Sequence, residues 1–296
     1  MSELGLRHLY RGKVRDLYAV GENHLLMVAS DRLSAFDVVM NEAIPQKGRV
    51  LTALTSYWLD ELPEIPRALV SCDPLVIETY VPGFLEATQY HGRSMLVRKA
   101  EMLPLECIVR ARLAGQAYDE YRVSGRVHDM PAPEGLSLTD AFPAPWFTPS
   151  TKADEGHDEN ISIERAREIV GDELLERAQE LCLTLFNLAA DRMAAAGLVL
   201  ADTKFELGFV DDELVVCDEI LTPDSSRMWP ADQIVSGETP PSFDKQPFRD
   251  WLATLSWDKT PPPPTVPDEV IEITSARYIA AYERVTATPL NSWFGA

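Results

Sequence analysis

The sequence has few of the residues and motifs that mark common enzyme sites. Its four cysteines are scattered without a C-x-x-C pair, and its five histidines lack the spacing of a zinc site. There is no G-x-S-x-G elbow, no Gly-rich dinucleotide fingerprint and no Walker A loop. Zinc-hydrolase, serine-hydrolase and dehydrogenase functions therefore lack support. Three of the cysteines lie in apolar runs, which predicts buried free thiols.

Positive charge and long apolar runs are also scarce. The 296 residues include 27 Lys and Arg against 47 Asp and Glu, and this net charge of −20 argues against a broad nucleic-acid-binding surface. No apolar run could span a bilayer, and the first residues lack the apolar segment of a signal peptide. We therefore expect a cytoplasmic protein with neither nucleic acid nor membrane as a partner. Its oligomeric state stays open.

Apolar periodicity and turn residues predict an α+β chain. The expected strands are 8–11, 14–20, 24–29, 75–80, 94–100 and 105–112. The expected helices are 46–61, 115–123, 163–170, 172–196, 245–255 and 268–285. Residues 124–160 are rich in proline and turns, and we expect them to form a long loop. The pattern predicts an antiparallel β-rich N-terminal lobe (1–113), a mixed α/β lobe (114–296) and a cleft between them.

The segment from residue 201 to 208 carries the clearest chemical signal. In a strand, Asp202, Lys204 and Glu206 share one face, while the apolar residues between them face the core. If the following turn has three residues, 211–213, Glu206 lies directly opposite Asp218. Carboxylates beside a lysine suit Mg²⁺ and phosphate. The alternative is a solvent-facing hairpin with ordinary charges.

Other segments carry weaker signals, each with a structural alternative. Gly12, Lys13 and Arg15 suit phosphate, or form a plain tight turn. Residues 96–104 could border an adenine as a hinge, or simply end an edge strand. Arg110 and Arg112 share a strand face that either binds anions or is solvated. Residues 30–37, 147–160 and 223–227 are rich in hydroxyls and charges, as in hydrogen-bonded turns or a surface loop.

Six segments, in order, together resemble one family. They are 12–16 (GKVRD), 30–37 (SDRLSAFD), 44–48 (IPQKG), 147–152 (FTPSTK), 202–206 (DTKFE) and 218–227 (DEILTPDSSR). From about residue 8 to 250 the chain resembles phosphoribosylaminoimidazole-succinocarboxamide synthase, the SAICAR synthetase family. Leu207 stands where an aromatic residue is commoner and Leu33 where Ile is. The sequence after about 255 carries no assignable motif.

The resemblance implies a two-lobed, ATP-grasp-like or kinase-like fold with the active site in the cleft. It implies ATP-dependent ligation of carboxyaminoimidazole ribonucleotide (CAIR) to L-aspartate in purine biosynthesis, giving SAICAR, ADP and phosphate through an acyl phosphate. The implied cofactors are ATP and Mg²⁺.

The resemblance also implies roles for individual residues. Residues implied to bind the nucleotide are Gly12, Lys13, Val14, Arg15, Lys99, Glu101, Met102, Lys204 and Glu206. The implied metal ligands are Glu206 and Asp218, with Asp202 in or just behind the first shell. The implied substrate-binding residues are Ser34, Asp37, Arg110, Ser150, Thr151, Lys152, Ser225, Ser226, Arg227 and Lys245. Lys204, Asp218 and Arg110 are the implied catalytic residues, and 150–152 would order over the aspartate site as a lid.

Two alternatives belong to other classes. A small-molecule kinase could use the same lysine and carboxylates with a hydroxyl acceptor. A nucleotide-sensing module would bind ATP without turnover.

Overall fold

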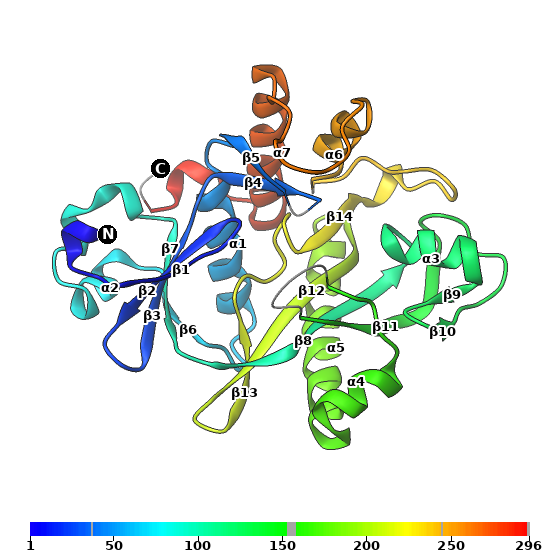
Figure 1. Ribbon diagram of the computed structural model, residues 1–296, viewed down its shortest axis with the longest axis horizontal. Helices are drawn as coiled ribbons and strands as arrows, with labels where there is room; N and C mark the ends of the chain where they lie inside the picture. Colours follow the sequence, from blue (N-terminus) through cyan, green and yellow to red (C-terminus); the bar gives the residue numbers. More distant parts are fainter. Residues whose placement is uncertain (37, 153–157, 244, 295–296) are drawn as a thin grey trace.

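Two five-stranded antiparallel sheets form the framework of the chain (Figure 1). They belong to a computed structural model that describes residues 1–36, 38–152, 158–243 and 245–294. Helices pack on these sheets, so the predicted α+β class is confirmed. Within the described residues, no helix is long and apolar enough to cross a membrane.

The first sheet is formed by the N-terminal part of the chain. Its strand order is β1 (His8–Arg11), β2 (Arg15–Val20), β3 (His24–Ala29), β7 (Ser94–Arg98) and β6 (Leu69–Ser71). The predicted turn at 21–23 connects β2 to β3, with Val20 paired to His24. A helix absent from the predictions, α2 (Pro74–Tyr80), follows β6.

The second sheet contains the longest strands. Its order is β11 (Ala141–Thr151), β8 (Glu101–Arg112), β12 (Leu198–Val210) and β13 (Glu213–Cys217), and β14 (Ser226–Pro230) also pairs with β12. Strand β8 follows β7 after two residues, so the two sheets are directly connected. The predicted lobe boundary at 113 stays a prediction, and β8 lies before it while belonging to the second sheet.

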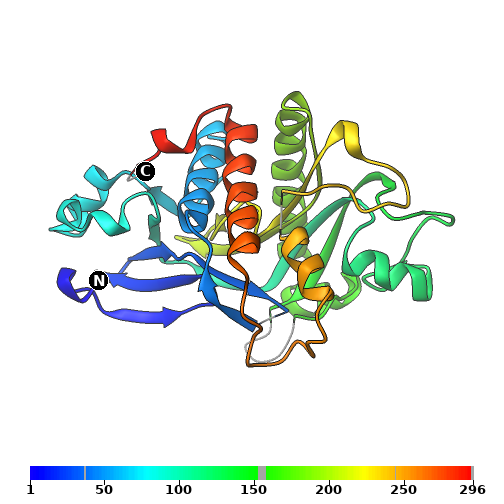
Figure 2. The same ribbon diagram turned by 90° about the horizontal axis from the view of Figure 1, so that it is seen from above.

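Three long helices lie on one side of the sheets: α1 (Lys47–Glu61), α5 (Asp172–Ala195) and α7 (Asp268–Thr286) (Figure 2). They share a core with β8 and β12 that includes Trp58, Phe186, Phe205 and Tyr278. All four cysteines are buried free thiols, as predicted.

The remaining elements are short. The helices are α3 (Gln116–Ser124), α4 (Ile163–Val170) and α6 (Gln246–Ala253), and the strands are β4 (Arg32–Ala35), β5 (Val38–Ala43), β9 (Arg126–Val127) and β10 (Met130–Pro131). Short 3₁₀ turns cover Ser2–Leu4, Phe84–Glu86, Thr88–Tyr90, Ala231–Gln233 and Leu290–Ser292. The predicted N-cap Ser162 accepts a hydrogen bond from the Arg165 backbone at the start of α4.

Two of the predicted elements are wrong. Residues 75–80 form helix α2 instead of a strand, because Asp73 caps its first turn and Pro74 fits the first helical position. The predicted loop 124–160 contains the long strand β11, although Pro143, Pro145 and Pro149 lie in it. Proline is tolerated there because β11 is an edge strand with only β8 beside it in the sheet.

Candidate active site

Strand β12 carries three charged residues at alternate positions. Asp202, Lys204 and Glu206 are separated by fully buried residues such as Phe205, so the predicted division into a polar and a core face is confirmed. Strands β8 and β13 hold β12 on both sides at its C-terminal half. The charged groups are therefore fixed by backbone pairing.

The turn after β12 is one residue shorter than predicted. It consists of Asp211 and Asp212, with φ values of 51° and 65°, which fits a two-residue hairpin turn. Glu206 consequently pairs with Cys217, and the predicted register with Glu206 opposite Asp218 is wrong by one residue. Aspartate tolerates positive φ, so this Asp-Asp pair can form the shorter turn.

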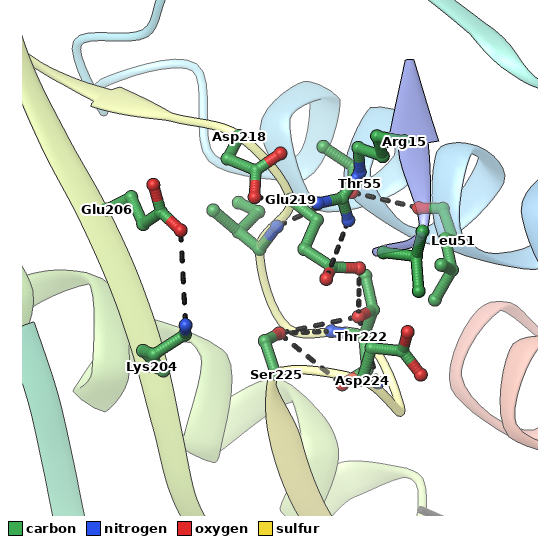
Figure 3. Close-up of polar contacts among 12 residues, drawn as sticks. Arg15, Leu51, Thr55, Lys204, Glu206, Asp218, Glu219, Thr222, Asp224 and Ser225 are labelled. Atoms are coloured by element: carbon green, nitrogen blue, oxygen red, sulfur yellow. Dashed lines mark hydrogen bonds and ion pairs between the residues drawn. The ribbon is translucent and has the colours of Figure 1, made fainter. Parts of the chain in front are cut away.

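Asp218 nevertheless reaches the same region as Glu206. It follows β13 with a φ of 54°, in the left-handed region that redirects the chain. Its carboxylate lies 2.7 Å from the guanidinium of Arg15, whose other nitrogen lies 2.6 Å from Glu219. Figure 3 shows these carboxylates together with Glu206 and Lys204.

Two lysines neutralise the acidic residues of β8 and β12. The Nζ atom of Lys152 lies 2.5 Å from Glu206, while Lys204 donates to Glu106 and lies 3.9 Å from Glu206. The sequence predictions did not include Glu106. Glu106 lies on the same face of β8 as Arg110 and Arg112. Following this alternation four residues back from Arg110 would have identified it.

The charge balance of this acidic group favours binding of a cation. Burial raises the pKa of Asp218 to about 7; Arg15 opposes this shift, and the nearby Glu206 and Glu219 add to it. Burial disfavours the charge of Lys204, but Glu106 and Glu206 raise its pKa overall. Lys204 therefore stays cationic, while the Asp218 carboxylate lacks full compensation near neutral pH.

The donor set fits Mg²⁺ bound together with a nucleotide. Mg²⁺ commonly takes one or two carboxylates and completes its shell with phosphate oxygens and water. Glu206 and Asp218 supply two such carboxylates. In the part of the chain that the structure describes, no three acidic, His or Cys side chains form a metal-binding group.

Asp202 is engaged elsewhere. Its carboxylate lies 2.7 Å from Arg110 and 2.6 Å from Arg227, and it is four residues from Glu206, roughly 13 Å along the strand. The structure thus brings Asp202 to two arginines and not to the acidic group. Gly115, with φ 56°, lets the Arg227 guanidinium lie against the backbone, since a Cβ there would meet it at 2.3 Å.

Two residues that the sequence did not predict, His128 and Asn160, contact predicted site residues. The Nδ1 atom of His128 is 2.8 Å from the Pro149 carbonyl, so Nδ1 carries the proton and Nε2 faces Arg110 at 3.4 Å. Burial, followed by the charge of Arg110, lowers the pKa of His128 to about 4, which keeps it neutral. Ser150 donates to the Asn160 side chain at 2.8 Å. Neither His128 nor Asn160 has a spacing to other residues that would identify it as a site residue from the sequence.

Beside the arginines lies a polar pocket of about 100 Å³. Ser225, Ser226, Arg227 and Lys245, all predicted substrate-binding residues, line it together with Arg249. Asp202 and Asp224 also line it. The three cationic side chains outnumber these carboxylates, and together with the hydroxyls they suit a phosphate or carboxylate.

The predicted nucleotide loop connects β1 to β2 in the first sheet. The Gly12 amide donates to the Arg15 carbonyl at 2.7 Å, and Arg32 donates to the carbonyls of Gly12 and Lys13, each at 3.1 Å. Val14 is half-buried and Lys13 is exposed. The loop therefore presents Lys13 outward while its last residue, Arg15, reaches Asp218.

The predicted adenine-bordering residues lie where the two sheets join. Lys99 is in the two-residue connection, and Glu101 and Met102 begin β8. All three are exposed.

The other predicted residues are less closely grouped. Ser34 is on β4 opposite Val39, and Asp37 lies outside the described residues. Thr151 accepts a hydrogen bond from the Glu159 backbone. Residues 153–157, which follow Lys152, are also outside the description, so the structure does not test the lid.

A comparison with protein families identifies the chain. The family model described as SAICAR synthetase matches residues 8–264. The chain belongs to this family. The predicted resemblance is thereby confirmed.

Curated relatives of the SAICAR synthetase family match over almost the whole chain. One from Syntrophotalea carbinolica, named phosphoribosylaminoimidazole-succinocarboxamide synthase, is 51% identical over 95% of both chains. A solved structure described as SAICAR synthase from Saccharomyces cerevisiae complexed with SAICAR is 41% identical, with a TM-score of 0.87 over 96% of both chains. Another, described as SAICAR synthetase (Type-2) in complex with ADP, is 25% identical, with a TM-score of 0.69 over 96% of this chain and 99% of that one.

The departures from the SAICAR synthetase pattern lie in the core. Leu33 and Leu207 are fully buried, so they do not alter the polar site. The matched region ends at residue 264, before α7.

Proposed function

We infer that this member of the SAICAR synthetase family condenses CAIR with L-aspartate, using ATP, in de novo purine biosynthesis. Relatives that match almost the whole chain, one of them at 51% identity, carry this enzyme's name. One observation in the structure supports the inference most directly. The acidic group around Glu206 and Asp218 and the cationic group around Arg110 and Arg227 are attached to the same sheet.

Such a layout suits transfer of phosphate to a carboxylate. An unactivated carboxylate does not form an amide in water, because its oxygen is a poor leaving group. The carboxylate of CAIR attacks the γ-phosphorus of ATP, and ADP leaves. The aspartate amine then attacks the acyl carbon of the resulting acyl phosphate, and phosphate departs. Catalysis is mostly alignment and charge neutralisation.

On this proposal, Gly12, Lys13 and Arg15 hold the ATP phosphates, and Lys204 lies against them. Residues 99–102 border the adenine. Glu206 and Asp218 hold Mg²⁺, which when bound neutralises phosphate charge. Asp202, paired with two arginines, orients these arginines instead of ligating the metal.

The ribonucleotide anions occupy the cationic end of the sheet. Arg110, Arg227 and Ser225 contact the phosphate or carboxylate of CAIR, with Lys245 at the edge of the same pocket. Ser150 and Lys152 are assigned to the aspartate side.

The test is ADP release measured with ATP and Mg²⁺ while CAIR and L-aspartate are varied separately. The synthase requires both substrates for sustained turnover. Phosphoryl transfer to an alcohol without any amine would instead identify a small-molecule kinase.

Asp218→Ala separates the enzyme from a nucleotide-sensing module. The synthase loses at least about 100-fold in turnover, since a group that neutralises phosphate charge is removed. A sensing module would bind ATP and have no turnover to lose. A cytoplasmic location stays a prediction.

A further inference from the structure

Helix α7 reaches the edge of the site, although it lies outside the region matched by the family model. Tyr278, on its third turn, is fully buried, and its hydroxyl donates to Asp224 Oδ1 at 2.5 Å. Asp224 belongs to the loop between β13 and β14 and lines the 100 Å³ pocket. The C-terminal helix thus contacts the loop that carries the predicted substrate-binding serines.

Asp224 is surrounded by two lysines as well as this tyrosine. Lys47, the first residue of α1 and fully buried, lies 2.6 Å from Oδ2, and Lys245 lies 3.3 Å from Oδ1. Burial opposes the charge on Asp224, but Lys245 and Lys47 lower its pKa overall. The carboxylate therefore stays ionised and can hold both lysines.

The two carboxylate oxygens have different partners. Lys47 occupies Oδ2, while Tyr278 and Lys245 share Oδ1. The Tyr278 hydroxyl consequently fixes the rotation of the carboxylate that Lys245 faces. Figure 3 shows the Asp224 carboxylate at the turn that leads back to Ser225.

We propose that Tyr278 is a positioning residue for the ribonucleotide anion, acting through Asp224 on Lys245. Three cationic side chains (Lys245, Arg227 and Arg249) and two carboxylates (Asp202 and Asp224) line the pocket, which leaves a net positive charge there. An anion entering the pocket meets this excess charge in the orientation that Asp224 sets. The inference rests on the proposed function, because CAIR supplies the anion.

Tyr278→Phe tests the proposal, with Tyr282→Phe as the matched control. Tyr282 lies one turn further along α7 and is also buried, and its backbone carbonyl accepts a hydrogen bond from the Thr286 hydroxyl at 2.9 Å. Tyr278→Phe should raise the KM for CAIR about fivefold, the usual factor for one hydrogen bond, with the KM for ATP unchanged and kcat within about twofold. Tyr282→Phe should leave all three constants at the wild-type values.

A second experiment, in the Lys245→Met variant, distinguishes a positioning role of Tyr278 from general destabilisation of the protein. In Lys245→Met, whose own KM for CAIR is raised, adding Tyr278→Phe should raise it no further, because the two residues act in series. Equal KM values for Tyr278→Phe and Tyr282→Phe, or full additivity with Lys245→Met, would overturn the inference. Wild-type protein that fails to release ADP with CAIR and aspartate would instead refute the proposed function.

Discussion

Arg15 and Asp218 are 203 residues apart in the sequence, and their side chains lie 2.7 Å apart. Arg15 begins β2 of the first sheet, and Asp218 follows β13 of the second. This ion pair therefore joins the nucleotide loop to the acidic group. Burial raises the pKa of Asp218, although Arg15 opposes this shift. The protonation state of Asp218 near neutral pH therefore decides how much negative charge the acidic group carries.

We predict that binding of Mg²⁺ with nucleotide weakens as the pH falls below 7. The pKa of Asp218 is raised to about 7, so the carboxylate is ionised above that value and protonated below it. A proton then competes with the metal, and affinity drops by up to about tenfold per pH unit. Calorimetric titration of Mg²⁺ with a non-hydrolysable ATP analogue measures this slope. Asp218→Asn should flatten it; an unchanged slope would contradict the assignment.

Glu106→Gln should lower kcat about tenfold by releasing Lys204 from its ion pair. In the wild-type protein, Lys204 lies 3.9 Å from Glu206. In the variant we expect Lys204 to turn toward Glu206 and away from the ATP phosphates that it is proposed to contact. Steady-state kinetics with saturating CAIR and aspartate measure the effect. Glu213→Gln, an exposed change in the same sheet, is the control. Equal kcat values for the two variants would argue against a role for Glu106.

Gly115→Ala should weaken CAIR binding more than Gly125→Ala does. Both glycines flank α3 with positive φ, but only Gly125 (φ 68°, ψ 13°) lies in the left-handed helical region, where alanine costs roughly 1–2 kcal/mol. Gly115 (φ 56°, ψ −139°) lies in a region nearly restricted to glycine, so alanine costs more there. Only at Gly115 would the new methyl meet Arg227, at 2.3 Å, and displace its guanidinium from Asp202. Thermal unfolding should shift further in Gly115→Ala than in Gly125→Ala, so the KM values are compared at a temperature at which both variants are folded. The KM for CAIR should rise in Gly115→Ala alone.

Phe205→Ala should destabilise the fold by about 3–5 kcal/mol, because the fully buried ring leaves a cavity between the sheet and the helices. Denaturant unfolding measures this change. Phe209→Ala, on the same strand but half-buried, should lose clearly less. Both rings lie on the core face of β12, so similar losses at the two positions would contradict the difference in burial between them.

Local signals in the sequence predicted most elements. The spacing of apolar residues marked α1 and α5, and Gly197 marked the end of α5. The two misassigned segments contain conflicting signals. Val76 and Ile77 favour a strand, whereas the Asp73–Pro74 start favours a helix, and the cap prevailed.

The site was predicted in its residue types but not in all its pairings. Alternation along β12 correctly placed Lys204 and Glu206 on one face. The pairing register of β12 with β13 was wrong because the turn between them is one residue shorter than predicted. The partners of Asp202 come from β8 and β14, and no local pattern states which strands pair. Tyr278 and Lys47 contact Asp224 only through tertiary packing, so sequence spacing could not assign them to the pocket.

The pairing of β8 with β12 fixes the distance between the two groups of charged residues at the site. Glu106 and Arg110 on β8 lie opposite Glu206 and Asp202 on β12. On the proposed function, the nucleotide site and the anchor for the phosphate of CAIR are therefore four strand residues apart, and the carboxylate of CAIR reaches from this anchor to the γ-phosphorus. Insertions in the surrounding loops can reshape access to the site without altering that spacing. The span over which CAIR is held is thus set by backbone pairing and not by the loops.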